Sequence, residues 1–170
     1  MTDRDLRIAA LNFSWLEEGH VAGCRGPRSD EDLAFLRSLG VQALVRLASD
    51  QESGVTSADV ERSGIRECYE PVQDWRAPSQ EQIDRIIDFI SGAVTNAEAV
   101  AVSCGAGYGR TGTVLACYIV WKGVPPEAAI EQLISARPCS REILRVPDQR
   151  EAVFEFGRRK QTLKKHVSGA

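Results

Sequence analysis

The amino-acid sequence predicts a single α/β domain with a central twisted, mostly parallel sheet of four to five strands flanked by helices. Short apolar segments alternate with segments of helical periodicity, and the chain finishes in helical segments. Its 170 residues, 43% of them hydrophobic, fit one domain with a substantial core. We expect this domain to span residues 1–170, with a core over about 12–156 and a polar, basic tail over 157–170.

The first half of the chain is expected to supply strands that alternate with short helices. Residues 12–24 mix aromatic side chains with glycines, which fits short strands joined by a turn. Residues 29–39 begin with a capping-box pattern and stop before a glycine, which indicates a helix. Residues 41–47 read as a strand, 55–62 as a short helix and 65–72 as a further strand.

The second half contains the clearest helix, which follows Ser79. Its apolar residues recur with helical spacing at Ile83, Ile86, Ile87, Ile90 and Val94. Residues 99–102 are expected to form a short buried strand, and a helix follows from Thr111, with an apolar run of helical length over 113–122. Prolines then begin two more helices, over 125–136 and 147–156.

Between that buried strand and the apolar helix lies a glycine-rich loop, residues 103–112, with the sequence Ser-Cys-Gly-Ala-Gly-Tyr-Gly-Arg-Thr-Gly. Its backbone N–H groups and the positive end of the helix suit a phosphate dianion. The Arg110 guanidinium can hold two phosphate oxygens at once. The same positive field favours the thiolate form of Cys104, so we expect a nucleophile that attacks phosphorus. The predicted phosphate-binding residues are Gly105, Ala106, Gly107, Tyr108, Gly109 and Arg110.

The other cysteines and the histidines indicate neither a disulfide framework nor a metal site. Five cysteines without a C-x-x-C pair, and two histidines near opposite ends of the chain, lack the required spacing. We expect Cys24, Cys68, Cys117 and Cys139 to be inert. No metal and no cofactor is predicted.

Charge and hydropathy argue against nucleic-acid and membrane partners. The net charge is −3, and the only basic cluster, within 158–165, fits a solvated helix end. The longest apolar stretch, 113–121, is shorter than the roughly 20 residues that span a bilayer, and the polar N-terminus lacks the apolar core of a signal peptide. We expect a monomer in the cytoplasm.

Residues 104–110 fit the C-x5-R signature of the cysteine-dependent protein tyrosine phosphatases. Four further stretches share the resemblance: Asn-Phe-Ser-Trp at 12–15, Gln-Ile-Asp-Arg at 82–85, the run 109–118 and Ala-Val-Phe at 152–154. Over roughly 12–156 the chain resembles the small atypical dual-specificity phosphatases, which consist of a catalytic domain alone.

The resemblance implies a protein phosphatase with a second catalytic residue. The family's general acid is an aspartate about thirty residues before the nucleophile, and Asp74 stands in that place. Cys104 would attack phosphorus while Asp74 protonates the leaving oxygen, and water activated by Asp74 would then hydrolyse the cysteinyl-phosphate. Thr111 would donate a hydrogen bond to the sulfur, and Gln149 resembles a glutamine near the attacking water, although a surface position is equally compatible. The substrates would be proteins carrying phosphotyrosine, and phosphoserine or phosphothreonine as well.

This chain departs from the family in two places. The family has a histidine directly before the cysteine, where this chain has Ser103. That histidine fixes the loop and helps to hold the thiolate, so its loss bears on activity; we nevertheless expect a functional enzyme. The segment 141–147 is longer than in relatives and is expected to reshape one wall of the pocket.

Four alternatives compete with a protein phosphatase. Ser103 raises the possibility of a phosphate-binding pseudoenzyme, although Cys104, Arg110 and Asp74 are all retained. A lipid or inositol phosphatase would favour basic residues inside the loop, where this chain has neutral ones. An RNA 5′-phosphatase would favour a basic channel, and a Cys/His hydrolase lacks a suitable histidine, because neither His20 nor His166 has a catalytic pattern around it.

Overall fold

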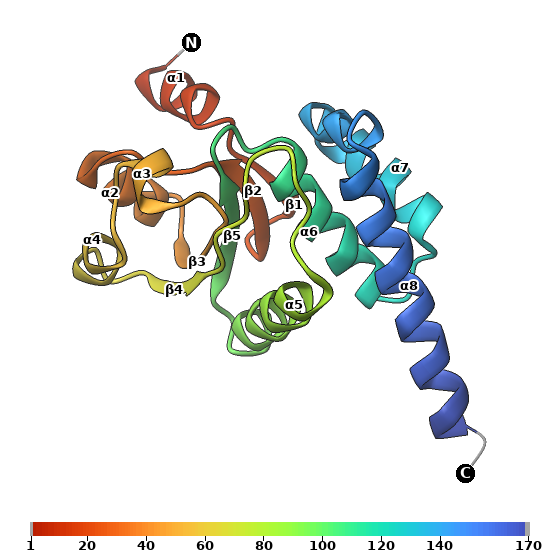
Figure 1. The fold of residues 1–170 in the computed structure, drawn as a ribbon. Coiled ribbons are helices and arrows are strands. Elements are labelled where there is room, and N and C mark those ends of the chain that lie inside the picture. The colour runs from red at the N-terminus through yellow and green to blue at the C-terminus, as the bar shows by residue number, and fades with distance from the viewer. Residues whose placement is uncertain (1, 169–170) are drawn as a thin grey trace.

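A computed structural model describes residues 2–168 and shows a five-stranded sheet with helices on both faces (Figure 1). The strands are β1 (Ser14–Glu17), β2 (Val21–Arg25), β3 (Val41–Arg46), β4 (Arg66–Tyr69) and β5 (Ala99–Cys104). Their order in the sheet is β1-β2-β5-β3-β4, with β1 antiparallel and the other pairs parallel. The predicted fold class is confirmed.

The central position of β5 brings the loop after it to the middle of the sheet edge. This strand pairs with β2 on one side and β3 on the other, and all six of its residues are buried. Parallel sheets bind ligands in the crevice outside the carboxyl ends of their strands. Because β2, β3 and β5 all end at this edge, the segments that follow them surround residues 105–108.

Helices from the two halves of the chain cover opposite faces of the sheet (Figure 1). One face carries α1 (Asp3–Ala10), α2 (Asp30–Ser38), α3 (Asp50–Ser53) and α4 (Ser57–Arg62). The other carries α5 (Gln80–Thr95), α6 (Gly109–Trp121), α7 (Pro126–Ala136), the 3-10 helix η1 (Pro138–Leu144) and α8 (Pro147–Ser168). Each face buries its own apolar cluster, which makes burial of apolar surface the main stabilising contribution.

The α6 helix lies at the centre of the larger cluster. Every residue from Gly109 to Val120 is buried, because the sheet packs on one side and α5, α7, α8 and η1 pack around the rest. This explains why its sequence is apolar on all sides rather than along one stripe. A rigid α6 fixes the position of the loop from which it starts.

Three short elements were not expected from the sequence: α1, α3 and η1. The predicted tail continues α8 as helix to Ser168. Arg159 pairs with Asp84 and thereby ties α8 to α5.

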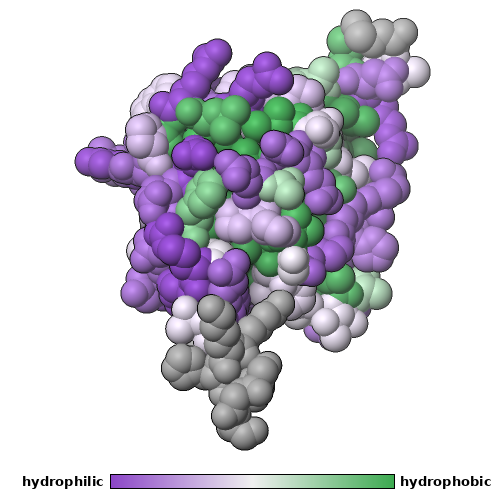
Figure 2. Space-filling view, turned by 90° about the vertical axis from the view of Figure 1, so that its right-hand side faces the viewer, coloured by the Kyte–Doolittle hydropathy of each residue, from purple (hydrophilic) through white to green (hydrophobic). Residues whose placement is uncertain are grey.

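Figure 2 shows the outer face on this side of the molecule, where polar side chains are interspersed with apolar ones. Within residues 2–168, no helix combines the length and the apolar character that crossing a bilayer requires.

Candidate active site

The glycine-rich loop turns sharply between β5 and α6, and Gly107 makes that turn possible. Its φ is +80°, in the left-handed region that favours glycine. A Cβ on Gly107 would come within 2.5 Å of the Cys24 carbonyl carbon and 2.6 Å of the Arg25 nitrogen. The loop therefore packs directly on the backbone of β2, and only glycine fits at this point.

Cys104 ends β5 at the base of the loop and is 2% exposed. Its Sγ accepts a hydrogen bond from the Gly107 backbone N–H at 3.3 Å. The Cys104 carbonyl accepts another from Gly26 N–H at 2.6 Å, which fixes the nucleophile to the segment after β2. These two hydrogen bonds hold the Cys104 side chain and backbone in place at the base of the pocket.

Arg110 is 2% exposed, and Glu52 of α3 holds its guanidinium. Nη1 donates to Glu52 Oε2 at 2.9 Å and to the Val72 carbonyl at 2.8 Å, and Nη2 donates to Glu52 Oε1. Burial opposes the charged form of Arg110, but the hydrogen bonds with Glu52 and the neighbouring charges of Cys104 and Asp74 raise its pKa overall. In return, the hydrogen bonds from Arg110 lower the pKa of Glu52. Glu52 and the Val72 carbonyl thus fix the position of the Arg110 guanidinium beside the loop.

Asp74 reaches the site from the loop between β4 and α5, thirty residues before the nucleophile. Its Oδ1 lies 3.1 Å from Arg110 Nη2 and accepts the Trp75 backbone N–H at 3.0 Å. The side chain is 63% exposed, so it faces the open mouth of the pocket, where a leaving group would depart. The structure thus brings together Cys104, Arg110 and Asp74, as the sequence suggested.

Ser103 and Thr111 flank the loop, and neither hydroxyl makes a hydrogen bond with the sulfur. The buried Ser103 hydroxyl donates to the Val45 carbonyl of β3 at 3.1 Å, so it joins two strands. The predicted hydrogen bond from Thr111 to Cys104 is not formed: Thr111 Oγ1 is buried without a partner among the described residues. The first turn of α6 directs this hydroxyl into the interior, where it remains the one buried polar atom of the loop's own helix without a hydrogen bond in residues 2–168.

Gln149 and Glu142 form the wall next to Gly109. Gln149 is 1% exposed, so the surface alternative for this residue is wrong. Its Nε2 donates to the Arg76 carbonyl at 3.2 Å, while its Oε1 has no partner among the described residues. Glu142 Oε1 accepts the Gly109 backbone N–H at 3.0 Å. A Cβ on Gly109 would collide with both side chains, so the two oxygens lie close together beside the loop.

The residues around the loop enclose a pocket of about 520 Å³. Trp75, 60% exposed, and Tyr108, 40% exposed, give its rim aromatic surface. Arg25 is paired with Asp32, whereas Arg28 makes no ion pair within residues 2–168. A larger hollow of about 720 Å³ between residues 77–80 and α8 contains neither the nucleophile nor Arg110, so the chemistry points to the smaller pocket.

The other thiols differ from Cys104 in their surroundings. Burial raises the pKa of Cys24 to about 12 and that of Cys68 to about 11, and it raises the pKa of Cys117 still further. These three side chains are therefore neutral thiols, as expected. Among the described residues, no group of three or more His, Cys, Asp or Glu side chains is placed to hold a metal ion.

Sequence reasoning missed Glu52 and Glu142. A signal for Glu52 was available, because a buried arginine requires a countercharge and Glu52 follows β3 at the same sheet edge as the loop. Glu142 lies in the segment expected to reshape the pocket wall, but no local pattern distinguishes it from the neighbouring charged residues.

Comparisons with known proteins agree with this geometry. The family model described as "Polymorphic toxin system, DSP-PTPase phosphatase" matches residues 22–124, more than half of the chain. The solved structure of Tk-PTP in the active form superposes with a TM-score of 0.79 at 27% identity, and the match covers 86% of this chain and 97% of that one.

Two curated relatives show the range of similar proteins. The uncharacterized protein MJECL20 of Methanocaldococcus jannaschii is 41% identical over 93 residues, which are 54% of this chain and 60% of that protein. The phosphatidylglycerophosphate phosphatase PTPMT2 of Arabidopsis thaliana is 32% identical over 130 residues, or 75% of this chain and 56% of that protein. The chain thus spans little more than half the length of these curated relatives.

Proposed function

This chain belongs to the DSP-PTPase phosphatases of the cysteine-dependent protein tyrosine phosphatase superfamily, and from that premise we propose that it hydrolyses phosphotyrosine in proteins through a cysteinyl-phosphate. Phosphoserine and phosphothreonine are further substrates in this proposal. The observation that carries it is the convergence of three groups on one pocket: the Cys104 sulfur, the Arg110 guanidinium and the Asp74 carboxylate.

The first chemical step transfers the phosphoryl group to the enzyme. Cys104 Sγ attacks phosphorus, the phosphorus–oxygen ester bond breaks, and the leaving oxygen takes its electron pair and a proton from Asp74. The loop amides and Arg110 hold the three equatorial oxygens as charge develops on them. Glu52 keeps Arg110 oriented, because its carboxylate accepts hydrogen bonds from both Nη1 and Nη2.

The second step releases phosphate. A water molecule gives a proton to Asp74 and attacks phosphorus, and the sulfur–phosphorus bond breaks to restore the thiolate. Gln149 supports this step, since its unpartnered, buried Oε1 lies next to the loop and can accept a hydrogen bond from that water. No step requires a charge from Ser103, whose hydroxyl is committed to β3.

An aromatic substrate suits the rim of the pocket. The exposed rings of Trp75 and Tyr108 can pack against the ring of phosphotyrosine, and the phosphate would lie between Arg110 and Cys104. Trp75 lies in the same loop as the acid, Asp74, and Tyr108 lies in the same loop as the nucleophile, Cys104. Substrate binding would therefore help to place Asp74 over the leaving oxygen.

Turnover of aryl phosphates by matched variants tests this proposal. Cys104→Ser is expected to reduce kcat/KM by more than about 10³-fold, because the hydroxyl is a poor nucleophile at neutral pH. Cys117→Ser is the control and should retain activity, since Cys117 is buried within α6. Undiminished turnover in Cys104→Ser would contradict the mechanism.

Asp74→Asn separates the acid from the nucleophile. The loss in kcat/KM, which reports the first step alone, should approach the roughly 10²–10⁴-fold range of a general acid for phosphotyrosine peptides. The loss should be smaller for nitrophenyl phosphate, whose leaving oxygen needs no proton. An equal loss for both substrates would argue against Asp74 as the acid.

A phospholipid monoester is the second candidate substrate. It is favoured by PTPMT2, a phosphatidylglycerophosphate phosphatase that is similar over three quarters of this chain. Arg28 would meet a second anionic group of such a lipid at the pocket mouth. Recovery of phospholipid rather than phosphoprotein by the Cys104→Ser variant from a lysate would favour this candidate over the first.

A further inference from the structure

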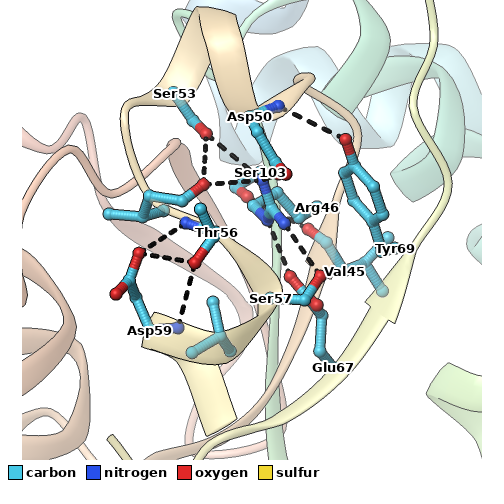
Figure 3. A network of polar contacts seen from close by, with 12 residues as sticks. Val45, Arg46, Asp50, Ser53, Thr56, Ser57, Asp59, Glu67, Tyr69 and Ser103 are labelled. Atoms are coloured by element: carbon cyan, nitrogen blue, oxygen red, sulfur yellow. Dashed lines mark hydrogen bonds and ion pairs between the residues drawn. The ribbon is translucent and has the colours of Figure 1, made fainter. Parts of the chain in front are cut away.

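Among the side chains that the structure describes, the most completely buried cation lies outside the pocket, at the end of β3. Arg46 is 0% exposed, and its guanidinium lies between α3, α4 and β4 (Figure 3). Nε donates to Glu67 at 2.7 Å, Nη1 donates to Asp50 at 2.7 Å, and Cζ lies 4.1 Å from the Tyr69 ring centroid. Burying a charge is costly unless its donors are satisfied. These contacts offset the cost, and the elements that they join show what the buried Arg46 holds together.

Two of the hydrogen-bond partners of Arg46, Asp50 and Ser53, belong to α3, the short helix that carries Glu52. Nη1 also donates to Ser53 Oγ at 3.2 Å and to the Val55 carbonyl at 3.0 Å, and Nη2 donates to Ser57 Oγ at 3.2 Å. The Asp50 backbone N–H in turn donates to the Tyr69 hydroxyl at 3.3 Å. Arg46 thus holds α3 at residues on both sides of Glu52.

A helix as short as α3 depends on such contacts. Four residues form a single turn, and isolated helices below roughly 12 residues are marginal in water. Within α3 only Ser53 is buried, so apolar packing contributes little. The Arg46 contacts and the Ser49 cap hold the turn of helix from which the Glu52 side chain reaches Arg110.

The end of β3 reaches Arg110 by a second route. The Leu47 carbonyl accepts the Val72 N–H at 2.9 Å, and the Val72 carbonyl accepts Arg110 Nη1 at 2.8 Å. Both hydrogen-bonding routes, through Glu52 and through Val72, therefore converge on the guanidinium that would bind phosphate.

We propose that Arg46 is a positioning residue for phosphate binding: it fixes α3, and through Glu52 it sets the orientation of Arg110. This inference rests on the proposed phosphatase function. Arg46 touches neither the substrate nor the reacting atoms. Its effect is carried by Glu52, which distinguishes it from a residue that only stabilises the contact between β3 and β4.

A double-mutant cycle tests the coupling. Arg46→Lys keeps the charge but loses the forked geometry, and we expect kcat/KM for an aryl phosphate to fall about tenfold. Inorganic phosphate should bind about tenfold more weakly by calorimetry, a readout that needs no turnover. In a Glu52→Gln background the same change should alter both quantities less than about threefold, because the intermediary is already lost.

A neighbouring arginine provides the matched control. Arg66 of β4 also pairs with a glutamate, Glu98 at 2.5 Å, and lies over an aromatic ring, Phe89 at 4.4 Å. Arg66→Lys should leave kcat/KM and phosphate affinity within about twofold of the parent. Should Arg46→Lys not fold, Asp50→Asn removes the charge of one Arg46 partner at a half-exposed position. We expect this variant to lose less kcat/KM and less phosphate affinity than Arg46→Lys, and to show the same dependence on Glu52.

Two results would overturn the inference. One is an equal loss from Arg46→Lys, or from Asp50→Asn, in the presence and absence of Glu52. The other is unchanged phosphate affinity in a folded Arg46→Lys protein. If the proposed function is wrong, the parent protein will show no turnover that depends on Cys104. The affinity for inorganic phosphate would still test the role of Arg46 in that case.

Discussion

Glu142 places a negative charge where a bound phosphate would also be negative. Its carboxylate accepts the Gly109 N–H, one of the loop amides that the dianion would use. Like charges in contact across a binding site are costly. Under the proposed function, a substrate would have to displace Glu142 or share this amide with it, and we expect the residue to limit affinity for dianions.

Removing this charge should strengthen phosphate binding. Glu142→Gln keeps an oxygen for the Gly109 N–H, and we expect KM for an aryl phosphate and the Kd of inorganic phosphate to fall about three- to tenfold. Glu151→Gln is the control, since Glu151 pairs with Arg158 on α8 outside the pocket. An unchanged KM in Glu142→Gln would contradict this expectation, and a higher KM would show that the carboxylate assists binding instead.

Among the individual site residues, those with a distinctive local sequence pattern could be predicted from the sequence. Cys104 and Arg110 are separated by a fixed spacing within glycines, and Asp74 was identified from its position in a family pattern. Glu52 and Arg46 have no such pattern, because their roles arise only when β3, β4 and β5 are aligned. Ser103 looked like a lost catalytic group, yet its contact with Val45 is a strand-to-strand link.

The element that sets the geometry of the site is the turn from β5 into α6. Gly107 combines a positive φ with close backbone packing against β2. Gly123, which follows α6, has a φ of +106°, and a Cβ at this position would meet no atom of the described residues within 4 Å. A side chain at Gly123 would cause backbone strain alone, whereas one at Gly107 would cause backbone strain and a steric collision.

Alanine at the two positions should have unequal effects. Gly123→Ala carries backbone strain alone and should lower the free energy of unfolding by about 1 kcal/mol without changing kcat/KM. Gly107→Ala must also displace the loop from Cys24, so we expect a larger loss of stability and a drop in kcat/KM of more than about tenfold. Equal effects in urea unfolding and in turnover would contradict the packing argument.

Among the elements, length decided what the sequence could predict. The helix α5 is 16 residues long with regular apolar spacing, so its existence was clear. The helix α3 has four residues, and η1 has seven without a helical stripe. The helix α1 buries none of its residues and relies on a Thr2 capping box, so its polar sequence gave no core-facing pattern.

For the whole molecule, alternation of strands and helices predicted the fold class but not the strand order. That order places β5, the last strand in the chain, between β2 and β3. Its pairing joins residues far apart in the sequence, such as Val21 with Val100, and no local pattern specifies such a partner. The position of the active loop at the centre of the sheet edge follows from this non-local pairing.

Acid stability is a whole-molecule property because several carboxylates are tied to arginines. Hydrogen bonds from Arg110 and from Arg85 lower the pKa values of Glu52 and Glu70 from their ordinary value of 4.5. A carboxyl with a lowered folded-state pKa stabilises the fold above its unfolded value, and this contribution is lost as pH falls through the folded value. Stability should therefore decline as the pH falls below about 4.5.

Urea unfolding between pH 7 and pH 3 measures this decline. The free energy of unfolding of Glu52→Gln should fall less steeply below pH 4.5 than that of the parent, since glutamine cannot be protonated. Glu61→Gln is the comparison, because Glu61 makes no ion pair within the part of the chain that the structure describes. Parallel curves for the parent and Glu52→Gln would exclude this contribution.

The central claim is that Cys104 receives the phosphoryl group, and trapping of that intermediate tests it most directly. The Asp74→Asn protein, mixed with a radiolabelled aryl phosphate whose leaving group needs no proton, is quenched under denaturing conditions and digested. Because hydrolysis of the intermediate lacks its base, we predict label on the peptide that contains Cys104, and none when Cys104 is also replaced by serine. Release of free phosphate without label on that peptide, or label on a different residue, would contradict the account.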